Sequence, residues 1–147
     1  MRKQLTLAAL ICMLGGTWAG VSAETNDTST TKSFIPTIGI GEFIGEKLDL
    51  TTFRNSFGPR REPGMRHFAD FGIRPTKTTD QLIEYDLVDW WYSISIKERR
   101  DVNGDGLEDL IIAFTDKAKE GSYFSSTELL ITRYSETSDL LALAFTP

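Results

Sequence analysis

Apolar residues alternate with polar ones along the later part of this chain, and this pattern restricts the fold more than any other feature. A period of two over several residues is typical of strands that bury one face. No segment long enough for the crossover helix of a parallel sheet lies between the rows. The sequence therefore predicts an antiparallel β meander. The apolar rows are Ile83, Tyr85 and Leu87; Trp90, Tyr92, Ile94 and Ile96; Leu110, Ile112 and Phe114; Leu129 and Ile131; and Leu141, Leu143 and Phe145.

A short helix is predicted before the meander. Leu50, Phe53 and Phe57 have the three- and seven-residue spacings of one helical face. Asp49 or Thr51 is placed to cap its first turn. Packed on one face of the sheet, this helix gives an α+β fold that is mainly an antiparallel meander with one short N-terminal helix.

Three further segments carry weaker patterns. Met65–Ile73 alternates imperfectly and predicts a strand. Residues 34–50 are rich in Ile and Phe but are broken by three glycines, so no long helix is predicted there. Trp90 and Trp91 are adjacent, so a strand places them on opposite faces. One is expected in the core and the other at a stacking or interface position.

The first residues have the pattern of a secretory signal. A basic start is followed by the apolar run 7–14 and by Val21-Ser22-Ala23, which fits a cleavage site. The apolar run is much shorter than the roughly 20 residues that span a bilayer. The sequence predicts a signal peptide over 1–23, a flexible leader over 24–33 and a single globular domain over 34–147. The mature protein is then periplasmic or extracellular, with no transmembrane anchor.

Charge and cysteine content narrow the function. Removal of residues 1–23 takes away Cys12, the only cysteine, and leaves 14 basic against 21 acidic residues, a net charge of −7. A chain without cysteine has neither a disulfide nor a thiolate nucleophile. The acidic balance argues against nucleic-acid binding, which needs clustered positive charge, and favours cationic partners or metal ions.

The segment DVNGDGLED at 101–109 is the strongest chemical signal. Asp101, Asn103, Asp105 and Asp109 place oxygen side chains at positions 1, 3, 5 and 9, and the Leu107 carbonyl falls at position 7. Calcium takes six to eight oxygen ligands, and a glycine at position 6 permits the sharp turn that directs them inward. The pattern predicts one bound calcium ion within a β-hairpin.

The same segment resembles the DxDxDG class of calcium loops. It begins as an EF-hand loop does, but Ile112 stands where that family has a glutamate, and no long helix flanks it. It is more similar to the strand–loop–strand hairpins of FG-GAP and integrin-type repeats. That resemblance implies Asp101, Asn103, Asp105 and Asp109 as side-chain ligands. Only one copy is present, so a propeller is excluded.

A metal-free hairpin is the alternative interpretation of this loop, because Asn-Gly and Asp-Gly are favoured in plain turns. A plain turn gives no reason for three carboxylates to share one loop. At a separation of about 6 Å they would repel by roughly 1–3 kcal/mol per pair, and a divalent cation removes that repulsion.

A basic stretch is the second candidate site. Residues 51–77 contain six basic and two acidic residues, and Arg60, Arg61, Arg66 and His67 could bind a phosphate or an acidic glycan. A solvated surface paired with local acids is the simpler interpretation. His67 has Asp70 three residues later, but no suitable serine motif accompanies it, so no catalytic residue is assigned.

Three functions are compatible with these features. The first is an exported, calcium-binding, non-catalytic binding or envelope module with a protein or an anionic glycan as partner. The second is a small secreted hydrolase that uses the Arg60, Arg61, Arg66 and His67 region. The third is an exported inhibitor of a basic enzyme, supported only by size and acidity.

Overall fold

A seven-stranded sheet dominates the computed structural model, which describes residues 31–54 and 56–144. The sheet order is β1-β7-β6-β5-β4-β3-β2. The strands are β1 (Leu48–Asp49), β2 (Lys77–Thr78), β3 (Leu82–Asp86), β4 (Trp90–Arg100), β5 (Asp109–Ala118), β6 (Phe124–Thr132) and β7 (Leu140–Ala144). Helix α1 (Ile40–Lys47) precedes β1, and the single 3₁₀ turn η1 (Leu50–Thr52) follows it.

Several sequence predictions fall on residues outside the described part. The signal peptide over 1–23, most of the leader over 24–33, and Phe145 lie there. In the described ranges, no helix has the length and apolar character needed to cross a membrane.

The predicted meander is correct for the long strands and wrong at one edge. Strands β2 to β7 pair antiparallel with their neighbours. Strand β1, in contrast, pairs parallel with β7, with Leu48 opposite Leu140. A two-residue strand has no periodicity to detect, and its partner lies about ninety positions later, so the sequence pattern could not show this pairing.

Strand β7 buries the alternate set of side chains to the predicted apolar row. Leu140 and Ala142 are buried, whereas Leu143 is 40% exposed and lies opposite Leu130 on the other face. A shift of one residue moves every side chain of a strand to the opposite face. The predicted row of Leu141 and Leu143 therefore lies on the face of the sheet away from the core.

The helix lies earlier than predicted. The segment 50–57 forms only η1, although Asp49 caps that turn by accepting the Thr51 N–H at 2.9 Å. The α-helix is instead α1, which contains Gly41 and Gly45. A Cβ atom at Gly41 would lie 2.2 Å from the Thr79 carbonyl oxygen, so glycine lets the helix approach the sheet. The predicted strand over 65–73 is a series of turns.

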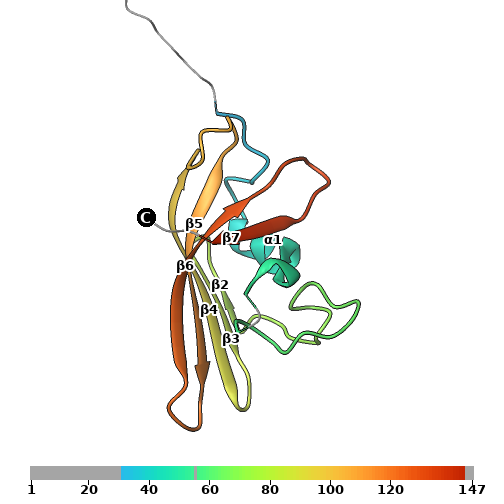
Figure 1. Ribbon diagram of the computed structural model, residues 1–147, viewed down its shortest axis with the longest axis vertical. Helices are drawn as coiled ribbons and strands as arrows, with labels where there is room; N and C mark the ends of the chain where they lie inside the picture. The colour runs from blue at the N-terminus through green and yellow to red at the C-terminus, as the bar shows by residue number, and fades with distance from the viewer. Residues whose placement is uncertain (1–30, 55, 145–147) are drawn as a thin grey trace, which may run out of the picture.

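The core lies between the sheet and the segments that cover one of its faces. Figure 1 shows α1 and the segment 56–76 on the same side of the sheet. Phe68 from that segment stacks on Tyr85 with ring centroids 4.1 Å apart, and Phe53 meets Phe114 edge-on at 4.9 Å. The core side chains of β3, β4, β5 and β6 belong to the predicted rows, which confirms those alternations: Ile83, Tyr85, Tyr92, Ile94, Leu110, Ile112, Phe114, Leu129 and Ile131.

Candidate functional site

The loop that joins β4 to β5 contains the five residues predicted to bind metal. We call Asp101–Asp109 the 101–109 loop. It connects two antiparallel strands, with Arg100 opposite Asp109 as the last pair. A bulge between Ile96 and Glu98 shifts the register just before it, which bends the end of the hairpin.

The polar side chains of the 101–109 loop bond to its own backbone. The Asp101 carboxylate accepts the Gly104 and Gly106 N–H groups at 2.7 and 2.9 Å. Asn103 accepts from the Asp105 N–H at 3.0 Å, and Asp105 accepts from the Leu107 N–H at 2.9 Å. These bonds hold a compact turn in which the oxygens of positions 1, 3 and 5 face the chain that curls around them.

Gly106 makes this turn sterically accessible. Its φ of 81° lies in the left-handed region, as does the 76° of Gly104, and side chains with a Cβ rarely adopt such values. Both N–H groups point to the Asp101 carboxylate. The role that the sequence predicts for glycine at position 6 is therefore matched by the local backbone.

Asp109 closes the loop and carries an unsatisfied oxygen. Its side chain is fully buried, and Oδ2 accepts the Val102 N–H at 3.1 Å. Its Oδ1 is buried with no hydrogen-bond partner. A buried carboxylate oxygen without a partner is energetically costly, so this position calls for a positive ligand or a donor.

The donor set fits a hard cation in the type of its atoms. Three carboxylates, one amide oxygen and the Leu107 carbonyl are the oxygen ligands that calcium prefers. Within residues 31–54 and 56–144, however, no three His, Cys, Asp or Glu side chains form a ready metal-binding group. The carboxylates of Asp101 and Asp105 accept backbone N–H groups instead. A bound cation would have to draw these oxygens together.

The beginning of the described chain pairs with this loop. Lys32 donates its N–H to the Gly106 carbonyl at 2.8 Å and accepts the Glu108 N–H at 2.8 Å. This is an isolated parallel bridge between Lys32 and Leu107. Figure 1 shows the blue segment lying beside the β4–β5 loop at the same end of the molecule.

Glu108, which is outside the ligand pattern, fastens that segment. Its carboxylate pairs with Arg99 at 2.6 Å and accepts the Ser33 hydroxyl at 2.6 Å. Arg99 in turn donates to the carbonyls of Ile35 and Pro36 at 3.3 and 3.0 Å. The hydrogen bond from Arg99 lowers the pKa of Glu108 despite its partial burial. The 101–109 loop is thus tied to residues 32–36 by backbone and side-chain contacts.

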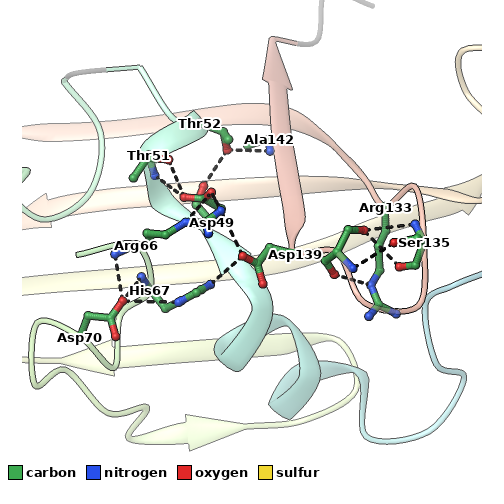
Figure 2. A network of polar contacts seen from close by, with 11 residues as sticks. Asp49, Thr51, Thr52, Arg66, His67, Asp70, Arg133, Ser135, Asp139 and Ala142 are labelled. Atoms are coloured by element: carbon green, nitrogen blue, oxygen red, sulfur yellow. Dashed lines mark hydrogen bonds and ion pairs between the residues drawn. The ribbon is translucent and has the colours of Figure 1, made fainter. Parts of the chain in front are cut away.

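A second polar cluster lies on the core side of the sheet, and Figure 2 shows it. We call Asp49, Arg66, His67, Asp70 and Asp139 the His67 cluster. Arg66 binds Asp49 through Nε at 3.1 Å and through Nη2, and it lies 3.1 Å from Asp139. The two ring nitrogens of His67 lie 3.4 Å from Asp70 and 3.5 Å from Asp139.

Hydrogen bonds lower the pKa values of two carboxylates in the His67 cluster. Burial alone would raise the pKa of Asp49, but bonds from Arg66 and Thr51 outweigh it and bring the pKa below its ordinary value. The pKa of Asp70 is lowered because the backbone N–H groups of His67 and Arg66 donate to it. These carboxylates are therefore held in the ionised form.

The four residues predicted to bind anions are only partly brought together. Arg66 and His67 meet, but each faces carboxylates. Arg61 donates to the backbone carbonyls of Thr51 and Phe53 and lines a shallow hollow with Arg66 and Glu62. Arg60 is exposed and forms no ion pair in the described ranges. No basic pocket is formed by all four residues.

Buried Asp116 is a further polar residue that the sequence did not single out. It is 1% exposed and accepts from the Trp90 indole and from the Gly58 N–H. Burial raises its pKa above the ordinary value, with these two bonds acting in the opposite direction. Trp90 packs beside Tyr92 and Tyr123. Asp116 therefore holds an aromatic group together at the end of the sheet that is far from the 101–109 loop.

Comparisons with known proteins give this chain no family. No protein-family model, curated protein or solved structure matches it. The functional argument consequently rests on the residues and their geometry.

Proposed function

We propose that this protein is an exported binding module that holds one calcium ion in the 101–109 loop and uses it to stabilise the fold. The observation that carries the proposal is the buried Asp109 Oδ1, which has no hydrogen-bond partner at the end of a loop with two further carboxylates. A divalent cation would satisfy that oxygen and remove the repulsion between the carboxylates.

Asp101, Asn103, Asp105 and Asp109 would hold the ion with their side chains, and Leu107 with its carbonyl. Calcium would offset two of the three negative charges of the ligand set and add to the hydrogen bonds that already close the loop. Extracellular modules bind calcium with dissociation constants of about 10⁻⁴–10⁻³ M, a range that suits an exported protein. A mature chain without cysteine has no disulfide, and a metal that binds only the folded state is an alternative source of stability.

Calcium titration followed by thermal unfolding tests this proposal. Binding to the folded state alone raises the free energy of unfolding by about 2.7 kcal/mol when free calcium is 100 times the dissociation constant. For a domain of this size the unfolding midpoint then rises by several degrees. Magnesium at the same concentration should raise it less, because it requires stricter octahedral geometry.

Two matched variants locate the effect. Asp105 is exposed, so Asp105→Ala should leave the fold intact and abolish most of the calcium response. Asp89→Ala removes the same charge from an exposed turn at the other end of the sheet and should respond to calcium as the parent does. An unfolding midpoint that ignores both calcium and chelator would reduce the loop to a plain hairpin.

The other two functions receive less support. A phosphate-directed hydrolase needs Arg60, Arg61, Arg66 and His67 to converge on one concave surface, and Arg61 is turned to backbone carbonyls while Arg66 faces Asp49. An inhibitor of a basic enzyme has the net acidity of the chain in its favour and no specific surface. Pull-down with cationic secreted enzymes would test the inhibitor function.

A further inference from the structure

The face of the sheet that α1 does not cover carries a row of four side chains from four adjacent strands. Asp86 lies opposite Trp91, Trp91 opposite Lys117, and Lys117 opposite Phe124. We call these four residues the aromatic–lysine row. Together with Lys119 they line one open hollow. The row lies near the start of β4, at the end of the sheet that is far from the 101–109 loop.

The two aromatic rings of the row are available to a ligand. Phe124 is 64% exposed and Trp91 is half-buried. Trp90, its neighbour in the chain, faces the core side and packs against Tyr92, so Trp91 is the tryptophan on the open face. Strands β4 and β6 are separated by β5, which places the two rings roughly 10 Å apart, two strand spacings. An extended ligand is needed to touch both.

The next row of the same face begins with Glu84, which pairs with Lys77, and continues with three short hydroxyl side chains. Ser93 lies opposite Thr115, and Thr115 lies opposite Ser126. The hydroxyls of Thr115 and Ser126 are 3.2 Å apart. These short side chains leave the rings of the aromatic–lysine row standing above a flat floor that can both donate and accept hydrogen bonds.

Positive charge lies between the rings. Lys117 is exposed, with no ion pair in the described ranges, and Lys119 pairs with Asp86. The hollow therefore has one uncompensated ammonium group in a protein whose net charge is −5. An anionic group placed beside the two rings would be attracted to this ammonium group.

We propose that the aromatic–lysine row binds an acidic oligosaccharide. Trp91 and Phe124 would stack on the apolar faces of two sugar rings, Lys117 would pair with a sugar carboxylate, and the hydroxyl floor would bond sugar hydroxyls. Aromatic side chains have a large apolar face and little conformational entropy to lose, which suits this kind of contact. The assignment gives a ligand class to the binding module proposed above and rests on that function.

Titration with a short oligogalacturonate tests the site, with the fully methyl-esterified oligosaccharide as the matched uncharged probe. Binding is measured by calorimetry and by tryptophan fluorescence at low salt. The acid should bind saturably and about fivefold more tightly than the ester, because an exposed ion pair with Lys117 adds only a modest attraction. Added salt should weaken binding of the acidic oligosaccharide and leave binding of the ester nearly unchanged.

Single substitutions separate the contribution of aromatic stacking to binding from the contribution of the lysine charge. Trp91→Ala should weaken binding of both probes by about tenfold or more, and Phe124→Ala should weaken binding of both to a smaller degree. Lys117→Gln should remove the preference for the acid, whereas Lys117→Arg should keep it. Lys97→Gln removes an exposed charge from the bulge of β4 and should change nothing. All four side chains reach the surface, and thermal unfolding checks that each of the five variants is folded.

Three outcomes would overturn the proposal. The first is that neither probe binds, and the second is that binding is indifferent to Trp91→Ala. The third is a concentration-dependent dimer that Trp91→Ala abolishes, which would make a second copy of the chain the occupant. Each titration is run in calcium and in chelator. If calcium stabilises the fold while neither probe binds, the calcium module stands and the oligosaccharide site falls.

Discussion

The 101–109 loop and the His67 cluster are both rich in carboxylates, but the chain assembles them in different ways. All the polar groups of the loop come from nine consecutive residues, and they bond mainly to the backbone of the same turn. The residues of the His67 cluster come from three separate segments. Asp49 lies in β1, residues 66–70 lie in the long connection before β2, and Asp139 directly precedes β7. One is a local structure and the other exists only in the folded protein.

This difference predicts how each region responds to the loss of a single side chain. In the loop, neighbouring bonds survive when one residue is changed, because the backbone turn remains. In the His67 cluster, Asp49 and Asp139 make contacts between segments that are distant in sequence, so losing such a contact frees a segment. Only the contacts of Asp70 are local. The first two predictions below use this contrast, and the third compares Asp49 with the buried Asp116. They run from the largest expected effect to the smallest.

Asp49→Ala should destabilise the protein most. The buried Asp49 carboxylate caps η1 through the Thr51 N–H and hydroxyl and binds Arg66. Its removal loses a cap and the charge-assisted bonds from Arg66, a cost of about 2 kcal/mol. Urea unfolding measures the change. Asp70→Ala, which removes an exposed carboxylate from the same cluster, should cost distinctly less. Equal losses would mean that burial does not distinguish the two.

Glu108→Gln should loosen residues 32–36 with a smaller cost, roughly 1 kcal/mol, since it weakens the partly buried pair with Arg99. Lys32 is the only Lys or Arg between residues 31 and 46, so trypsin reports directly on this segment. Cleavage after Lys32, followed by mass spectrometry, should accelerate about fivefold. Glu120→Gln, in the loop at the other end of the sheet, is the control. An unchanged cleavage rate would show that Lys32 is held by its backbone pairing alone.

Acidification should affect Asp49 and Asp116 with opposite signs. The pKa of folded Asp49 is below its ordinary 3.8, so its contribution to stability is present above pH 3.8 and is lost as pH falls through the folded value. The pKa of folded Asp116 is above 3.8, so stability declines as pH rises from 3.8 through the folded value.

Unfolding in urea between pH 3 and 7 would measure both. The free energy of unfolding of Asp116→Asn should rise relative to that of the parent as pH rises above 3.8. That of Asp49→Asn should fall relative to the parent as pH rises toward 3.8 from below. Two slopes of the same sign would contradict the assignment.

The parts of the structure that the sequence predicted are those whose signal is local. The alternation of Ile83 and Tyr85 lies within a single segment, and the structure confirms that core row. The turn residues of 101–109 also lie within one segment, and they do join two antiparallel strands. The calcium site predicted there stays a prediction. Segments such as α1 were missed because tertiary packing outweighs local propensity. Gly41 and Gly45 weaken a helix in isolation, yet they allow it to seat against the sheet.

The His67 cluster could be predicted only in part. The pair His67 and Asp70 is visible from a spacing of three, but Asp49 and Asp139 carry no sequence signal that relates them to Arg66. The sequence also could not show which face of β7 is buried. Residues 140–143 are all apolar, so alternation cannot distinguish the two faces.

Both outer strands of the sheet are only two residues long, and this has a consequence for how the protein behaves when concentrated. Exposed strand edges invite pairing between molecules, and short edge strands limit it. Beyond β1, the hydroxyl of Thr52 accepts the Ala142 N–H of β7 at 2.8 Å. Beyond β2, the hydroxyl of Thr76 accepts the Asp86 N–H of β3 at 3.2 Å. Side chains thus occupy main-chain donors that a foreign strand would need, which protects a strand-rich protein against edge-to-edge aggregation.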